Sequence, residues 1–416
     1  MQIRNLYCHP VTGEEDNSFV GLKIIPNRID FYYPEAFNLS TTPEGVQEDV
    51  LHILDSIRLA KTFSNQPSRG FLSSSKGDLA LNSYLWLIND FCKNGYYFGY
   101  QPISHFGIDG RINWKKTLQG NSIVSDGNII YPKIISERKQ KVIDVIGIIY
   151  RYCLYISVAN IGWLFNLSPI SFKVEKVTKG QRKYFINVIE KELSSTFDDL
   201  KRKRFTSMLE ILTGATISEG TEEFVYGVAN YYYVFERMVN YLLGTVKDMR
   251  IFNPSSNWYL LPNAFNPIPS SNLRPDTILI RNSDVFILDS KFYRYGHTMN
   301  NDDLPDSTSI EKQITYASNI ETSKKEIEGK LKIKINHIYN AFILPYNAQK
   351  NSFSSSDIFT YIGFAKPDWI NGNPTYGNIH TFLIDLRYLL YHWSKGNDND
   401  MINKLVSDIN KNFPIK

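Results

Sequence analysis

The sequence predicts an α/β (α+β) protein with two domains, and three observations support this prediction. The chain has 416 residues, which is more than one ordinary hydrophobic core requires. Apolar residues in its C-terminal half alternate between helical and strand periods, which is typical of a sheet flanked by helices. A small, polar, unpatterned stretch at 214–221 precedes that half. We therefore expect an N-terminal mixed α/β domain at 1–215 and a C-terminal domain at 216–416.

The expected N-terminal elements follow from periodicity and turn residues. They are strands at 19–25 and 28–33, helices at 46–63 and 78–94, strands near Ile123 and Ile129, a buried apolar segment at 142–165, and one or two helices within 180–213.

The expected C-terminal elements begin with a helix whose apolar residues lie on one face. They are a helix at 226–243, strands at 277–280 and 285–288 joined by a hairpin turn, a helix at 309–331 capped by Ser307, Thr308 or Ser309, and strands at 337–344, 359–364 and 380–384.

Composition and the absence of several motifs exclude some classes of protein. Hydrophobic residues make up 43% and charged residues 21% of the chain, as in ordinary soluble proteins. The first residues lack a secretory signal, and polar residues interrupt the longest apolar stretch, so we expect a cytoplasmic protein without a membrane span. The three cysteines are widely spaced and form no zinc-ligand pattern with the histidines. The sequence also lacks a phosphate-binding loop and a nucleophile elbow.

Positive charge is concentrated in the middle of the chain. Residues 133–204 contain 15 Lys and Arg against 7 Asp and Glu, whereas residues from 216 onward contain 20 against 21. Clustered Lys and Arg suit a polyanionic partner such as DNA, because they displace phosphate counterions. On charge alone, a solvated helix face explains the segment slightly better.

The strongest candidate site lies on the expected hairpin. Asp276 begins the first strand, and Asp289 ends the second strand two residues before Lys291. Strand alternation places Asp289 and Lys291 on one face, and pairing of the strands brings Asp276 towards Asp289. Convergent carboxylates suit Mg²⁺, with Mn²⁺ as a substitute, and a neighbouring lysine can orient or help deprotonate the attacking water. This combination predicts phosphodiester hydrolysis.

These residues resemble the PD-(D/E)xK nuclease superfamily, and they are most similar to the LlaJI-type restriction endonuclease family and more distantly to McrC, a nuclease subunit. The resemblance is strongest over 233–316 and implies a C-terminal restriction-endonuclease-like core with a mixed sheet. It assigns Asp276, Asp289 and Lys291 to catalysis, with Glu236 on the preceding helix as an accessory metal ligand. Helix geometry agrees for Glu236, because this residue adjoins the apolar face.

Related nucleases often carry a glutamine and a tyrosine on the helix after the lysine strand. Gln313 and Tyr316 occupy that helix here, with a spacing one residue shorter than usual. Packing of Tyr316 against the sheet explains that residue equally well.

The resemblance in the N-terminal half is carried by residues 110–117. It implies that this loop contacts DNA or a ring-forming AAA+-type NTPase subunit. A hairpin fixed by a buried Trp114 is the interpretation we prefer for the loop. The basic residues that we expect to contact DNA or the partner are Arg111, Lys115, Lys116, Lys201, Arg202, Lys203 and Arg204.

The sequence thus predicts a Mg²⁺-dependent DNA endonuclease subunit of a restriction (anti-phage) system, which acts on double-stranded DNA with an NTPase motor partner. Two alternatives stay open. One is a stand-alone site-specific endonuclease, and the other is a non-catalytic DNA-binding or assembly protein on a nuclease fold. Cleavage of two strands makes a homodimer or a higher assembly a reasonable expectation.

Overall fold

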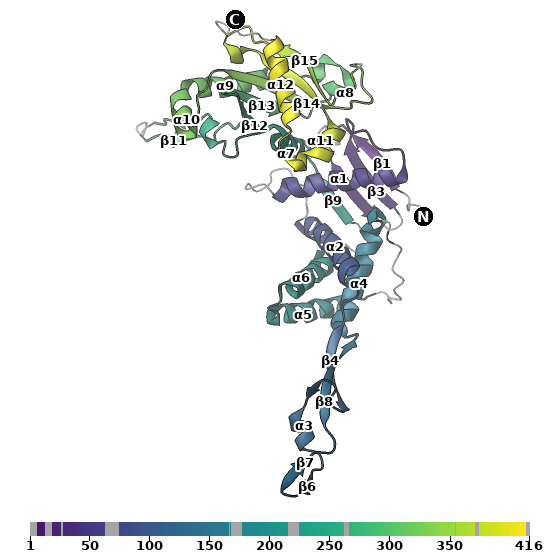
Figure 1. Ribbon diagram of the computed structural model, residues 1–416. Coiled ribbons are helices and arrows are strands. Elements are labelled where there is room, and N and C mark those ends of the chain that lie inside the picture. The colour runs from purple at the N-terminus through teal and green to yellow at the C-terminus, as the bar shows by residue number, and fades with distance from the viewer. Residues whose placement is uncertain are drawn as a thin grey trace. The chain divides into compact units, whose positions relative to one another are not determined.

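The structure is a computed structural model, and it describes residues 6–12, 19–25, 28–62, 75–165, 167, 177–214, 224–261, 266–353, 355–370 and 374–412 (Figure 1). The chain forms two compact units. Unit 1 combines Met1–Ser73 with Val225–Lys416, and unit 2 is the intervening Ser74–Phe224. This division differs from the expected domains at 1–215 and 216–416, because the first 73 residues pack with the C-terminal half.

A four-stranded sheet joins the two ends of unit 1. Its strand order is β1 (Leu6–Val11), β3 (Arg28–Pro34), β2 (Val20–Ile25) and β9 (Phe224–Val228). β1 is parallel to β3, and β2 is antiparallel to β3. Gly21 has a φ of +148°, and a Cβ there would lie 2.1 Å from the carbonyl oxygen of Tyr226, so this close backbone approach requires glycine. The expected helix at 226–243 is therefore wrong at its start, where β9 forms.

The second sheet of unit 1 is a mixed sheet, as the family resemblance implies, and it has five strands. Its order is β12 (Thr277–Arg281), β13 (Asp284–Ser290), β14 (Ile338–Tyr346), β16 (Ile379–Asp385) and β15 (Phe359–Ala365). The central pairs β13–β14 and β14–β16 are parallel, and both edge pairs are antiparallel. Asn282 and Ser283 both have positive φ, as a two-residue type I′ hairpin turn between β12 and β13 requires.

Helices cover both sheets of unit 1. They are α1 (Pro43–Thr62), α7 (Tyr232–Leu243), α8 (Tyr295–Thr298), α9 (Ser307–Thr322), α10 (Lys324–Leu331), α11 (Leu386–His392) and α12 (Asn399–Asn412), with short 3-10 turns at η3 (Arg250–Phe252), η4 (Asn301–Asp303), η5 (Thr375–Gly377) and η6 (Trp393–Lys395). The expected helix at 309–331 is two helices that meet at Ser323. Its cap is Asp306, whose carboxylate accepts from the Ser309 N–H, rather than one of the hydroxyl residues.

The face of the large sheet beneath α9 holds an apolar core. Ile278, Val285 and Ile287 pack there against Tyr316 and Ile320 of α9. Because side chains alternate along a strand, Asp276 and Asp289 extend the same rows of side chains as Ile278 and Ile287. The core therefore leads directly into the candidate site at the ends of β12 and β13.

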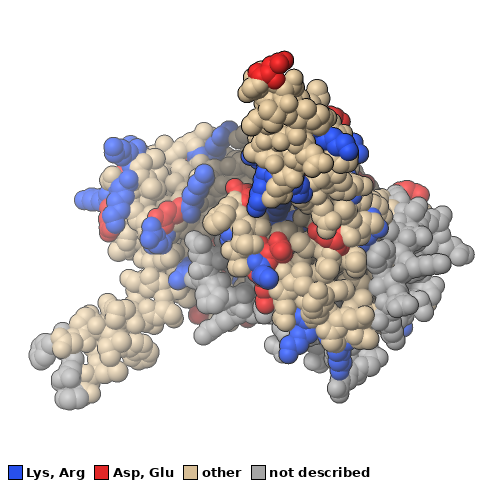
Figure 2. Space-filling view, turned by 90° about the horizontal axis from the view of Figure 1, so that it is seen from below, with Lys and Arg blue, Asp and Glu red and all other residues tan. Residues whose placement is uncertain are grey.

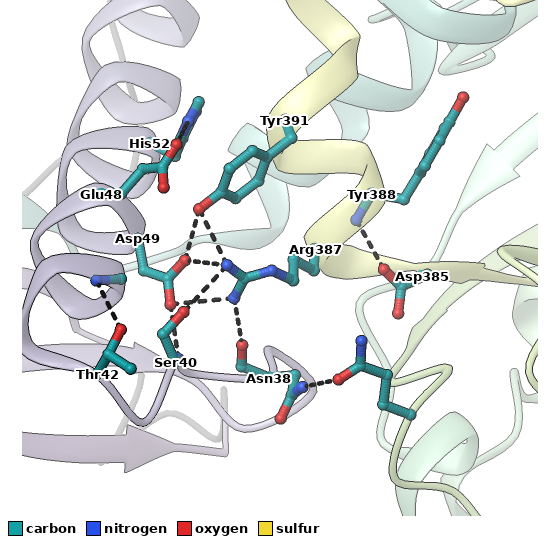
Figure 3. Close-up of polar contacts among 12 residues, drawn as sticks. Asn38, Ser40, Thr42, Glu48, Asp49, His52, Asp385, Arg387, Tyr388 and Tyr391 are labelled. Atoms are coloured by element: carbon teal, nitrogen blue, oxygen red, sulfur yellow. Dashed lines mark hydrogen bonds and ion pairs between the residues drawn. The ribbon is translucent and has the colours of Figure 1, made fainter.

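A polar junction connects the N-terminal helix α1 to α11 within unit 1 (Figure 3). The Asp49 side chain is fully buried, and an Arg387 guanidinium nitrogen lies 2.8 Å from its Oδ1. Arg387 also donates to the Asn38 carbonyl at 2.7 Å, and the Tyr391 hydroxyl donates to Asp49 at 2.6 Å. A buried charge needs such partners, so this junction requires residues from both parts of the sequence.

Unit 2 has helices that pack together and a long β-hairpin. The helices are α2 (Ser75–Asn94), α4 (Val145–Ile161), α5 (Lys179–Ser195) and α6 (Asp199–Gly214), with η2 (Gly162–Phe165) after α4. The hairpin pairs β4 (Gly99–Phe106) with β8 (Ile135–Val142), and the residues between these strands form β5 (Arg111–Ile112), α3 (Trp114–Leu118), β6 (Ile123–Ser125) and β7 (Asn128–Ile130). Figure 1 shows this hairpin leading away from the helices of unit 2 as an arm with β6 and β7 at its tip.

The apolar segment expected to be buried at 142–165 is helical, since it forms α4 and η2 from Val145 onward, after Val142 ends β8. By length and composition, Val145–Phe165 could cross a membrane, and it is the one such helix among the described residues. Half of it is buried inside the structure, and a core helix of a soluble protein passes the same test. Cys153 and Leu154, for example, are fully buried against the rest of unit 2.

Candidate active site

The β12–β13 hairpin brings the two aspartates together. Thr277 pairs with Leu288, so Asp276 and Asp289 flank the first residue pair of the ladder. The backbone N–H of Ser290 donates to Asp276 Oδ2 at 2.9 Å, which ties the first carboxylate across the hairpin to the second strand. The convergence that strand pairing predicts for these two residues is therefore present.

Lys291 forms an ion pair with Asp289. Its Nζ lies 2.7 Å from Asp289 Oδ2, and the two side chains are 18% and 8% exposed. The backbone N–H of Lys291 donates to the Ile343 carbonyl at 2.9 Å, which continues the pairing of β13 with β14 beyond the last strand residue. Both side chains leave the same face of the sheet, as alternation requires.

Helix α7 supplies the third carboxylate. Phe235 and Met238 are fully buried on its apolar face, and Glu236 lies half-buried beside them. The Phe235 ring meets the Phe292 ring edge-on at 5.3 Å, so α7 packs against the residue that follows Lys291. This contact explains how Glu236 comes within electrostatic range of Asp289.

All three carboxyl groups have pKa values above their ordinary range. Burial raises the pKa of Glu236 to about 7, and the charge of Asp289 contributes to this rise. Burial also raises the pKa of Asp276 well above its usual range, followed by the charges of Asp289 and Glu236. The pKa of Asp289 is raised by burial, although Lys291 and a hydrogen bond with Asp276 oppose that rise. One lysine thus offsets only part of the negative charge.

Lys291 itself stays protonated. Burial alone would lower the pKa of its ammonium group, but the charge of Asp289 and the hydrogen bond to it raise the pKa above the ordinary value. The side chain therefore acts as a cation and a hydrogen-bond donor.

A divalent cation fits this donor set. Hard cations bind carboxylate oxygens, and a charge of +2 would offset the burial that raises the pKa values of Asp276 and Asp289 and the repulsion that adds to the rise for Asp276. Among the described residues, no three His, Cys, Asp or Glu side chains are gathered closely enough to hold a metal ion by themselves. Two aspartates with water as the remaining ligands match the way Mg²⁺ is usually held. The assignment of Glu236 as a further ligand stays a prediction.

Helix α9 lies over the aspartates with its buried face towards them. Tyr316 is 4% exposed, and its hydroxyl donates to the Arg274 carbonyl at 2.9 Å. Burial and the charges of Asp289 and Asp276 raise the pKa of this hydroxyl. Tyr316 therefore packs in the core and also fixes the backbone two residues before Asp276. Gln313 is fully buried, and among the described residues neither atom of its amide has a hydrogen-bond partner.

The sequence analysis did not single out Lys312 of α9 or Asp306, which caps this helix. The charge of Lys312 is close enough to lower the pKa of Asp289, although Lys312 is exposed. The hydrogen bond from the Ser309 N–H lowers the pKa of Asp306, and the charge of Lys291 makes a smaller contribution. The sequence does contain a signal for Lys312, because this lysine adjoins Gln313 in the helix that the family resemblance implicates.

The expected contact residues of unit 2 fall into two groups. Arg204 is 8% exposed and forms a bidentate pair with Asp90, with both nitrogen–oxygen distances at 2.8 Å. That pair occupies the guanidinium in the helical core, so a DNA or partner contact by Arg204 does not fit the structure. The other expected contacts are exposed: Arg111, Lys115, Lys116, Lys201, Arg202 and Lys203. Lys116 among them pairs with Glu137 at 3.1 Å.

The expectation of a buried Trp114 is wrong. Trp114 is 58% exposed at the start of α3, because the arm is too thin to enclose an indole ring. Basic side chains do not merge into one surface on the face that Figure 2 shows. Figure 2 shows Lys and Arg in separate groups on the viewed face, interspersed with Asp and Glu.

Comparison with known proteins identifies the family. Residues 19–371 match the family model described as LlaJI restriction endonuclease. No curated protein matches the chain.

Two solved structures are similar at low identity. One is a refined half-complex from a tetradecameric assembly of Thermococcus gammatolerans McrB AAA+ hexamers with bound McrC, at 12% identity and a TM-score of 0.39, covering 94% of this chain and 83% of that chain. The other is the cryo-EM structure of the Thermococcus gammatolerans McrBC complex, at 15% identity and a TM-score of 0.22, covering 54% of this chain and 64% of that chain.

Proposed function

The chain belongs to the LlaJI restriction endonuclease family, and we propose that it is a Mg²⁺-dependent nuclease that hydrolyses phosphodiester bonds of double-stranded DNA with Asp276, Asp289 and Lys291. One observation carries this proposal. The β12–β13 hairpin gathers two buried aspartates and one protonated lysine at the end of a buried sheet. If Lys291 only formed a structural ion pair, one carboxylate would be enough to neutralise it. The presence of both Asp276 and Asp289 leaves an excess of negative charge at the site.

The roles of the residues follow from their geometry. Asp276 and Asp289 would hold Mg²⁺, with Mn²⁺ as a substitute, and Glu236 would adjust the charge beside them. The bound metal would supply charge stabilisation at the phosphate and an attacking water of lowered pKa. Lys291 Nζ keeps its proton, so it is suited to orient that water or to donate a hydrogen bond to charge that develops on the phosphate. Gln313 and Tyr316 would support the site from α9.

We further propose that cutting depends on an AAA+-type NTPase partner. The sequence has no phosphate-binding loop of its own, so any NTP hydrolysis requires another subunit. The arm of unit 2 is a suitable contact surface. Phe106, Ile108, Trp114 and Val124 are each more than half exposed along it, and solvated apolar patches of this kind mark interaction sites. Because two strands require two cuts, we expect a homodimer or higher assembly, acting in the cytoplasm.

Cleavage of plasmid DNA tests the proposal. Wild type, Asp289→Asn and Asp284→Asn are compared in Mg²⁺, in Mn²⁺ and in EDTA, each with and without the neighbouring NTPase subunit and its nucleotide. Asp284 is the matched control, because it lies at the opposite end of the same strand and pairs with His337 at 3.0 Å.

We expect Asp289→Asn to reduce metal-dependent cleavage by at least about 100-fold, since one metal-holding carboxylate is lost. Asp284→Asn should cut like wild type. Cleavage by the chain alone at a defined sequence would favour the stand-alone endonuclease. Equal behaviour of wild type and Asp289→Asn under every condition would refute the nuclease and favour the non-catalytic DNA-binding protein.

A further inference from the structure

An uncharged, exposed β-hairpin precedes the first catalytic strand in unit 1. Its two short strands are β10 (Asn257–Trp258) and β11 (Ile268–Pro269), which pair antiparallel, and the Ser270 N–H extends the ladder to the Ser256 carbonyl at 2.8 Å. Residues 251–273 contain no Asp, Glu, Lys or Arg, although Arg250 and Arg274 flank them. Neither the catalytic residues nor the arm of unit 2 accounts for this element.

The hairpin presents large apolar side chains to solvent. Trp258 is 60% exposed and Leu261 is 88% exposed, and three further apolar side chains beside them, Tyr259, Leu260 and Ile268, are also more than half exposed. Exposed apolar residues that gather on one small element are unusual on a surface that contacts only water. In Figure 1, β11 lies at the margin of unit 1 near α10.

Both ends of this segment are fastened to the helix that overlies the aspartates. Tyr316 donates to the Arg274 carbonyl at 2.9 Å, and the Asn319 amide donates to the Phe252 carbonyl at 3.4 Å. Tyr316 and Asn319 are three residues apart, so they lie on one face of α9. The base of the hairpin is therefore held beside the site, and Arg274 is only two residues from Asp276.

The number of residues between the hairpin and Asp276 sets an upper limit on the distance between them. Ile268 precedes Asp276 by eight residues, which span at most about 27 Å when fully extended. DNA rises about 3.4 Å per base pair along each strand, so a hairpin at that distance reaches about eight base pairs or fewer from the phosphate being cut. A duplex that is bound at Asp276 and Asp289 and runs towards β10 and β11 would pass within reach of Trp258.

We propose that the β10–β11 hairpin is a DNA-contacting element, in which Trp258 and its apolar neighbours stack on or wedge between bases that flank the scissile phosphate. This inference rests on the proposed nuclease function. Aromatic and apolar side chains contact bases in this way without reading their sequence. The absence of acidic residues over 251–273 avoids repulsion of the phosphates. The asparagines and serines of the segment can form hydrogen bonds to the sugar–phosphate backbone of DNA without adding charge.

Two measurements on the full-length chain test the hairpin. The first is duplex affinity by fluorescence anisotropy, for Trp258→Ala and Trp369→Ala in an Asp289→Asn background that prevents cutting. Trp369 is the matched control, because it is 52% exposed in unit 1 and distant from the hairpin in sequence. The second is photocrosslinking to duplexes that carry 5-bromodeoxyuridine, followed by identification of the crosslinked peptide.

We expect Trp258→Ala to weaken duplex binding by about 5- to 100-fold, the range for loss of one stacked base. Trp369→Ala should bind within about twofold of the parent, and the crosslinks should map to the peptide that contains Trp258 and Tyr259. Leu261→Ser, which alters the most exposed of these side chains, should also weaken binding. Circular dichroism and melting temperatures should match the parent, since substitutions of exposed side chains rarely change stability.

The outcomes separate this inference from the proposed function. If wild type cuts DNA while Trp258→Ala binds like Trp369→Ala and no hairpin crosslink forms, only the hairpin inference fails. If Trp258→Ala loses stimulation by the NTPase subunit but binds DNA normally, the hairpin is a protein-docking surface and the inference is wrong. If wild type neither binds nor cuts DNA in any condition, both proposals fail.

Discussion

Glu236, Asp276 and Asp289 lie within electrostatic range of one another, so the charge on one affects the pKa of another. Burial raises the pKa of each carboxyl, and mutual repulsion adds to the rise for Glu236 and Asp276. Lys291 opposes this rise from one side only. Without metal, the site is therefore destabilised as the pH rises, and a divalent cation has a physical reason to bind.

Glu236→Gln tests that local charge balance. The carboxyl titrates near pH 7 in the folded protein against about 4.5 for an ordinary glutamate, so folding binds extra protons between those values and stability falls as the pH rises through them. At pH 8 the ionised group costs about 3 kcal/mol of folding free energy, by the conversion from pKa to energy. We expect Glu236→Gln in EDTA to raise the melting temperature at pH 8 by several degrees and to change it little at pH 4.5.

A matched control for this measurement is Glu326→Gln, because Glu326 is an exposed helical residue that pairs with Lys330. That substitution should leave the melting temperature nearly unchanged at both pH values. Addition of Mg²⁺ at pH 8 should reduce the advantage of Glu236→Gln, since the metal stabilises the ionised carboxylates. A shift of equal size at both pH values would contradict the raised pKa.

Single elements of unit 1 depend on partners far away in the sequence. Helix α1 buries the carboxylate of Asp49, which Arg387 and Tyr391 of α11 neutralise and hydrogen-bond (Figure 3). Helix α9 contacts the backbone beside the candidate site through Tyr316 and the base of the β10–β11 hairpin through Asn319. Each element thus has a local periodicity that predicts its existence and a distant contact that sets its position.

Arg387→Ala tests the junction between α1 and α11. The substitution leaves Asp49 as a buried carboxylate without its cation, and breaking a buried pair in this way costs about 3–5 kcal/mol. We expect a clear fall in the urea midpoint of unfolding for unit 1. Arg250→Ala, which removes an ion pair between two exposed side chains, should leave that midpoint nearly unchanged. Similar midpoints for the two variants would show that the junction contributes nothing to stability.

The whole molecule is organised by an insertion. Unit 2 interrupts unit 1 between residues 73 and 225, and β9 on the far side of the insertion completes the sheet that β1, β2 and β3 begin. The nuclease core therefore shares unit 1 with the N-terminal residues. Unit 2 is left to carry the exposed arm and its apolar side chains.

Truncation tests this organisation. A chain that begins at residue 216 would be a complete nuclease domain if the chain divided into 1–215 and 216–416. In the observed organisation it lacks three strands and α1, so Arg387 loses Asp49 and the Tyr231 hydroxyl loses Ser56. We expect this fragment to be degraded rapidly by protease, and addition of residues 1–73 as a separate chain to restore protection. A fragment that resists proteolysis alone would refute the shared unit.

The sequence by itself determined the features that depend on neighbouring residues. Alternation along β12 and β13, with a two-residue turn between them, was sufficient to predict that Asp276 approaches Asp289 and that Lys291 shares a face with Asp289. Only the tertiary structure decided which side chains are enclosed. Arg204 lies in a helical core because Asp90 reaches it from 114 residues away, and Trp114 remains exposed because no described part of unit 2 covers it. Local periodicity indicates which face of a helix or strand is apolar, but it does not indicate which distant segment covers that face. The joining of residues 1–73 to the nuclease core is decided by such distant contacts.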